Sequence, residues 1–96
     1  MNKHSANNHK LRKQDFTKFS DVLETNLTEY LQKPQRYWNS NTLIEMVEET
    51  FIATNPKKPL VNKIRMKLEE TSSKGYNSVI QYLYNYILQS KDLGTV

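Results

Sequence analysis

The sequence predicts an all-α fold: a small bundle of four helices preceded by a flexible basic tail. Apolar residues recur at three- and four-residue steps in four separate stretches, which is the period of one helix face. Proline or glycine marks the connections between these stretches. No stretch shows the strict alternation of a β-strand. The 96 residues suit one domain, which we expect to span residues 15–96.

Residues 1–14 are expected to form a disordered basic tail, because they contain almost no apolar side chains and no helical periodicity. His4 and His9 have no third ligand nearby, so we expect no metal site there. The segment lacks the apolar run of a secretory signal, and its single arginine makes it a poor transit peptide.

The first predicted helix starts near Asp15 and ends before Pro34, which cannot donate to the preceding turn. Its apolar face consists of Phe16, Phe19, Leu23, Leu27, Tyr30 and Leu31. The connector that follows contains Tyr37 and Trp38. The pair is interpreted either as a lid over one end of the bundle or as a binding hot spot, since aromatic anchors dominate interface energies. Arg36 beside them also suggests stacking on a nucleotide base.

The second and third predicted helices have clear start signals. Thr42 followed by Glu45 reads as a capping box that opens the second helix. Pro59 suits the first turn of the third helix. Gly75 is placed to end that helix in the left-handed conformation.

The fourth predicted helix is opened by a second capping box, Ser78 to Gln81, and is apolar around nearly its whole circumference. Such a helix is normally buried, which favours a central helix held by the other three. The alternative is that one side meets a second chain, because a tyrosine joins a large apolar ring to a wet hydroxyl. The tyrosines proposed for such protein binding are Tyr82, Tyr84 and Tyr86.

Charge is unevenly distributed along the chain. Residues 1–18 carry a net charge of +4, residues 19–54 carry −4 and residues 55–75 carry +4, while residues 76–96 are neutral. The bundle should therefore have an acidic half and a basic segment, an arrangement that also favours contact between oppositely charged helices.

The segment 57–67 holds five positive charges and no negative one. It is interpreted as a solvated helix face, as a phosphate-binding surface, or as a docking surface for an acidic protein. A helix–turn–helix would place Asn62, Lys63 and Arg65 near the start of the reading helix. Against it, the connection contains two prolines and no glycine. The candidate residues are Lys57, Lys58, Asn62, Lys63, Arg65 and Lys67.

Several functions are not expected from this composition. There is no cysteine, both histidines lie in the tail, and two glycines leave no phosphate-cradling loop. We therefore expect no catalysis, no metal, no cofactor and no small-molecule substrate. The most apolar stretch, residues 79–88, is shorter than the roughly 20 residues that cross a bilayer, so we expect no membrane contact. The default location is the cytoplasm.

The function predicted from these patterns is binding to another protein, with self-association and an accessory-subunit role both left open. An apolar, tyrosine-rich helix face would supply affinity, and the separated charges would supply orientation. The alternative is a small nucleic-acid-binding regulator that uses residues 57–67 and the basic tail.

Overall fold

The structure, a computed structural model, describes residues 13–94. Within these residues the chain forms four α-helices and no strand, which confirms the all-α prediction. The elements are α2 (Lys13–Leu31), the short 3-10 helix η1 (Gln35–Tyr37), α3 (Ser40–Thr54), α4 (Lys58–Ser72) and α5 (Tyr76–Gly94). Residues 1–12, most of the predicted tail, lie outside the described part.

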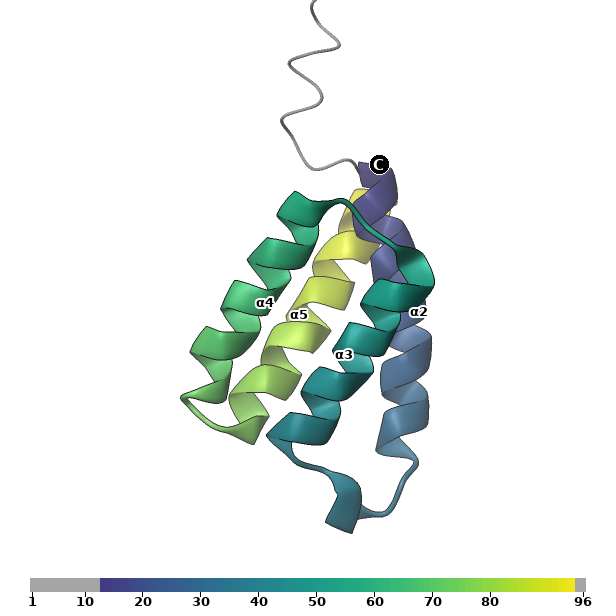
Figure 1. Ribbon diagram of the computed structural model, residues 1–96. Helices are drawn as coiled ribbons and strands as arrows, with labels where there is room; N and C mark the ends of the chain where they lie inside the picture. The colour runs from purple at the N-terminus through teal and green to yellow at the C-terminus, as the bar shows by residue number, and fades with distance from the viewer. Residues whose placement is uncertain (1–12, 95–96) are drawn as a thin grey trace, which may run out of the picture.

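Consecutive α-helices run in opposite directions, so that the start of α2 and the end of α5 lie at one end of the bundle and η1 lies at the other (Figure 1). α2 packs against both α3 and α5, whereas α4 packs mainly against α5. Contact between α3 and α4 is much smaller. The strong contacts therefore follow the order α3, α2, α5, α4.

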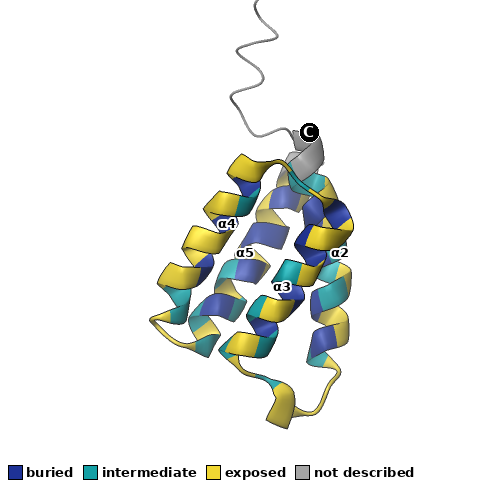
Figure 2. Cartoon of the chain, viewed as in Figure 1, coloured by how far each residue is buried: buried dark blue, intermediate teal, exposed yellow. Residues whose placement is uncertain are grey.

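Each helix turns its apolar stripe inward, as Figure 2 shows by the dark-blue residues on the facing sides. Phe19 stacks on Phe51 with ring centroids 5.1 Å apart and joins α2 to α3, while its contact with Tyr86 at 5.5 Å joins α2 to α5. The largest fully buried side chains are Phe19, Leu23, Leu27, Leu43, Val47, Thr50, Leu60, Ile64, Val79 and Leu83.

The first two helices start earlier than the sequence predicts. α2 begins at Lys13, so the last two residues assigned to the tail are helical. α3 begins at Ser40 and its N-cap is Asn39, not Thr42. The Asn39 side chain accepts from the Thr42 N–H at 3.0 Å, and the Thr42 hydroxyl accepts from the Asn39 N–H at 3.3 Å. Because asparagine caps a helix as well as threonine does, residue type could not decide between the two.

Of the start signals predicted for the last two helices, one is correct and one is wrong. Pro59 lies in the first turn of α4, as predicted. Ser78 does not cap α5, because that helix already begins at Tyr76, directly after Gly75. Gly75 has the predicted positive φ of 118°, but Ser73 is the C-cap of α4, so the glycine forms the turn into α5.

α5 packs mainly against two helices, so the prediction of a central helix held by the other three is wrong. It packs between α2 and α4, and its buried side contains Val79, Leu83 and Ile87. The flank of α5 next to this buried side keeps Tyr84 and Leu88 exposed, with 45% and 59% of their surfaces accessible. An apolar part of this helix therefore remains available to another molecule.

Candidate functional site

The structure separates the five aromatic residues proposed for protein binding. Tyr37 and Tyr84 are exposed, whereas Trp38 and Tyr82 are partly buried against the core. Tyr86 belongs to the core itself. Only Tyr37 and Tyr84 are therefore accessible anchors of the kind that the sequence predicts.

Tyr86 has a structural role, which corrects its assignment to a binding surface. Its ring stacks on Phe16 at 4.4 Å, and its hydroxyl donates to the Phe16 carbonyl at 3.3 Å. Burial raises the pKa of Tyr86, and burial raises the pKa of Tyr82 to about 12. Both hydroxyls are thus held in their neutral form by the packing of α5.

Trp38 agrees with the lid interpretation, since its side chain packs against the hydrophobic core at the η1 end. Its indole Nε1 is buried, and no other described residue accepts a hydrogen bond from it. Tyr37, its neighbour, points away from that core and has 48% of its surface exposed. The guanidinium of Arg36 lies over the Tyr37 ring, 4.9 Å from its centroid.

A first groove, of about 220 Å³, lies between α2 and α5. Its lining residues are Glu24, Leu27, Thr28, Tyr84, Ile87, Leu88 and Lys91. The Lys91 ammonium donates to the Glu24 carboxylate at 2.8 Å and so bridges the two helices. The groove combines an apolar base with one acidic and one basic side chain on opposite walls.

A second and larger groove, of about 450 Å³, lies between α2 and α3 and reaches η1. Its lining residues are Asn26, Glu29, Tyr30, Lys33, Tyr37, Thr42, Glu45, Met46 and Glu49. Tyr30 and Met46 are buried, while Glu29, Glu45 and Glu49 are exposed. A partly apolar hollow is therefore bordered by three carboxylates and one ammonium group.

A chain of hydroxyls fixes the η1 end of this second groove. The Tyr76 hydroxyl donates to the Tyr30 hydroxyl at 3.2 Å, and the Tyr30 hydroxyl lies 3.0 Å from the Thr42 hydroxyl. Thr42 in turn donates to the Tyr37 carbonyl at 2.6 Å. Burial, and then the hydrogen bond to Tyr30, raise the pKa of Tyr76. These contacts join α2, η1, α3 and α5 at one point and make this end of the groove rigid.

The basic segment does not form a helix–turn–helix. α3 and α4 run alongside each other in opposite directions (Figure 1), whereas the helices of that motif cross at about 90–120°. Lys63 and Arg65 point about 160° apart around α4, given 3.6 residues per turn. They therefore cannot reach one groove of DNA together. All six candidates are exposed, and among the described residues five of them have no hydrogen bond or ion pair to α3: Lys57, Lys58, Asn62, Lys63 and Lys67.

The sixth candidate, Arg65, is held by Glu48 of α3. Its Nε and Nη2 donate to the two carboxylate oxygens at 2.8 and 2.7 Å. The hydrogen bonds from Arg65 hold the pKa of Glu48 below its usual value, and the same bonds raise the pKa of Arg65. The guanidinium also lies 5.4 Å from the centre of the Phe51 ring. Arg65 therefore links α3 to α4 and is not free for phosphate.

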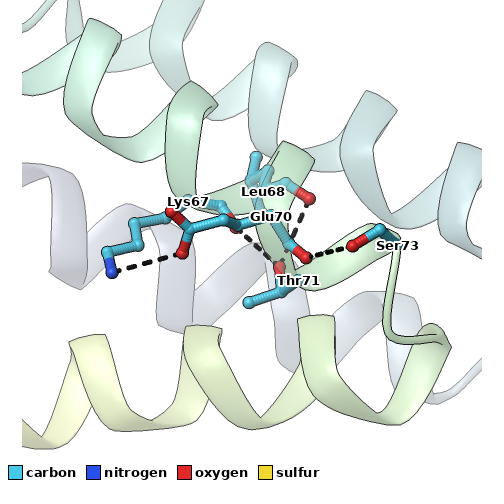
Figure 3. Close-up of polar contacts among 5 residues, drawn as sticks. All are labelled: Lys67, Leu68, Glu70, Thr71 and Ser73. Atoms are coloured by element: carbon cyan, nitrogen blue, oxygen red, sulfur yellow. Dashed lines mark hydrogen bonds and ion pairs between the residues drawn. The ribbon is translucent and has the colours of Figure 1, made fainter.

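Lys67 is also engaged, although more loosely. Figure 3 shows its ammonium reaching Glu70 of the same helix, at 3.5 Å. Farther along α4, the Thr71 and Ser73 hydroxyls donate to backbone carbonyls of their own helix. The polar side chains at the end of α4 thus bond within the helix, and the open basic charge is concentrated at its start.

The sequence interpretation missed the second groove. Glu45 and Glu49 are one helical turn apart, a spacing that is visible in the sequence. Nothing local indicates that Glu29 of α2 borders the same hollow, because that depends on which helices pack together. Met46 is likewise an ordinary apolar residue until its neighbours are known.

Across residues 13–94, no three histidine, aspartate or glutamate side chains are arranged to hold a metal ion. In the same span, no helix is both long and apolar enough to cross a membrane. Comparisons of the chain with protein-family models, with curated proteins and with solved structures find no match.

Proposed function

We propose that this chain is a non-enzymatic protein-interaction protein that associates with a second copy of itself through the exposed side of α5. The observation that carries the proposal is the exposure of Tyr84 and Leu88 beside the groove between α2 and α5. Tyrosine and leucine supply apolar contact area, and the tyrosine hydroxyl keeps a polar end for water or a partner. An accessory role in a larger assembly and a cytoplasmic location belong to the same proposal.

The charges beside this groove are self-complementary. Glu24 stands on one wall and Lys91 on the other. A two-fold axis brings the same patch of both copies together and places the Glu24–Lys91 ion pair of one copy beside that of its partner, where acid and base of the two pairs face each other. The small apolar area predicts a weak, reversible dimer, because stable interfaces bury about 1,200–2,000 Å².

The test is the molar mass of the protein by light scattering after size exclusion, over a wide range of concentrations. We expect the mass to rise toward that of a dimer with concentration. Replacing Tyr84 and Leu88 with serine should return the protein to a monomer. Ile52→Ser is the matched control, because Ile52 is 81% exposed on α3 and does not line the groove. A monomer at every concentration, or equal loss of dimer in the Ile52 variant, would contradict self-association through α5.

A second candidate function is nucleic-acid binding by the start of α4. The observation that favours it is that Lys57, Lys58 and Lys63 are exposed and have no acidic partner among the residues that the structure describes. Such binding should weaken steeply with salt, since each lysine that neutralises a phosphate releases a counterion. Changing the three lysines to alanine should abolish the retardation of a labelled duplex or single strand. Retardation that persists in the triple variant, or that does not decrease with salt concentration, would contradict nucleic-acid binding by these lysines.

A further inference from the structure

We infer that the groove between α2 and α3 is a second docking site, which binds a segment of a partner protein that carries lysine or arginine beside an apolar side chain. This site lies on the opposite flank of α2 from the groove that contains Tyr84, and it does not depend on self-association.

The shape of the groove is that of a binding site. Its volume of about 450 Å³ falls within the roughly 300–1,000 Å³ typical of ligand pockets. α2 and α3 form its two walls, and Tyr37 of η1 borders one end. A groove between two helices is a common seat for a third, amphipathic helix.

The base of the groove offers apolar contact. Met46 and Tyr30 are buried in it, while Tyr37 supplies an accessible ring at its edge. A methionine thioether adapts its shape to different partners. The hydroxyl chain from Tyr76 through Tyr30 to Thr42 keeps the η1 end in place. The site therefore loses little conformational freedom when a partner binds.

The border of the groove selects the charge of the partner. Glu29 projects from one wall, and Glu45 and Glu49 project from the other, with Lys33 as the single basic residue of the lining. Within residues 13–94, none of these three glutamates takes part in an ion pair. By contrast, Glu24, Glu48 and Glu70 are each held by a basic residue of this chain. Three carboxylates that have no ion pair within the described part of the bundle thus border this one groove.

The spacing of the carboxylates points to a partner segment that carries more than one basic side chain, and not to a single ion. Glu45 and Glu49 are neighbours on one helix face, about 5–6 Å apart at Cβ. Two basic side chains one helical turn apart on a partner match this interval. No three acidic groups of residues 13–94 converge as metal ligands. The complementary charges would orient the partner, and the apolar contact with Met46 and Tyr37 would hold it.

The experiment measures binding of a short synthetic helical peptide that has a leucine stripe flanked by lysines. Its counterpart carries glutamate in place of every lysine. Fluorescence anisotropy at low and moderate salt gives both affinities. We expect the basic peptide to bind and the acidic peptide not to bind. We also expect amide chemical shifts to change along α2 and α3 but not along α4.

The decisive comparison uses two double variants with the same change of charge. Glu45→Gln with Glu49→Gln should lower the affinity for the basic peptide by about tenfold, because two exposed charge pairs are lost. Glu69→Gln with Glu70→Gln on α4 should leave its affinity within about twofold, since neither residue lines the groove. Equal losses in the two variants, or no binding of the basic peptide, would overturn the inference. Neither result bears on dimer formation through Tyr84, which light scattering measures separately.

Discussion

Thr42 shows how one hydroxyl can organise several elements. It accepts from the Asn39 N–H in the capping box and donates to the Tyr37 carbonyl of η1. The Tyr30 hydroxyl lies 3.0 Å from the Thr42 hydroxyl and 3.3 Å from the Asn39 carbonyl oxygen, to which it donates. The start of α3, the end of η1 and one end of the groove between α2 and α3 therefore meet at this single side chain.

The identity of the α3 cap can be tested by comparing two single variants. Asn39→Ala should lower the free energy of unfolding by about 1 kcal/mol, because it removes the side-chain acceptor of the Thr42 N–H. Glu45→Ala should change it by less than about 0.5 kcal/mol, because Glu45 makes no cap contact. Urea denaturation followed by circular dichroism measures both values. A larger loss in the Glu45 variant would restore the cap expected from sequence.

The tyrosines of α5 predict a loss of stability at alkaline pH. Burial raises the pKa of Tyr82 to about 12 in the folded chain, above the ordinary value of about 10 that applies when it is unfolded. The folded state therefore favours the neutral hydroxyl. This contribution is complete below about pH 10 and is lost as the pH rises through the folded pKa.

The measurement is the melting temperature between neutral pH and pH 12, together with the absorbance of tyrosinate. Tyr82→Phe should reduce the alkaline fall in melting temperature, because phenylalanine cannot ionise. Tyr37→Phe is the control, since the Tyr37 ring is exposed at the edge of the bundle. The same alkaline profile in wild type and the Tyr82 variant would show that this tyrosine does not drive the transition.

At the scale of the element, the turns decide where each helix can pack. Gly75 holds a φ of 118°, which L side chains rarely adopt, and it directly precedes α5. A Cβ at this position would meet no atom within 4 Å. The requirement for glycine is therefore one of backbone conformation and not of space.

Gly75→Ala should accordingly lower the free energy of unfolding by about 1 kcal/mol or more, in spite of the open space around it. Lys74→Ala, at an exposed neighbouring position, should cost less than about 0.5 kcal/mol. Chemical denaturation of the two variants beside wild type measures the difference. Equal stability of the glycine variant would mean that the turn relaxes to a negative φ without loss.

At the scale of the whole molecule, one shared core makes the four helices interdependent. Leu83 is fully buried in α5, whereas Leu88 on the same helix is 59% exposed. Leu83→Ala should cost about 2–5 kcal/mol, because it removes buried contacts and leaves a cavity. Leu88→Ala should cost well under 1 kcal/mol in the monomer. Thermal unfolding followed by circular dichroism measures the loss of stability in each variant. Similar losses in the two variants would contradict the observed burial.

The sequence predicts the helices well because the information for them is local. Leu60, Ile64 and Leu68 follow one face of α4 whatever surrounds them, and Pro59 marks the start of that helix. The contacts between helices are not local. Arg65 and Glu48 are 17 residues apart, and no local sequence pattern indicates that they form an ion pair. The groove between α2 and α3 escapes prediction for the same reason, since its border joins residues from three elements.

The small contact between α3 and α4 has a consequence for how the chain folds. α4 packs mainly on α5, which follows it in sequence, and only slightly on α3, which precedes it. We therefore expect α4 to dock only once α5 has formed, so that the second half of the chain folds as a helical hairpin. The first half can already pair α2 with α3. Joining two such local hairpins keeps contact order low, and folding should finish within about microseconds to milliseconds.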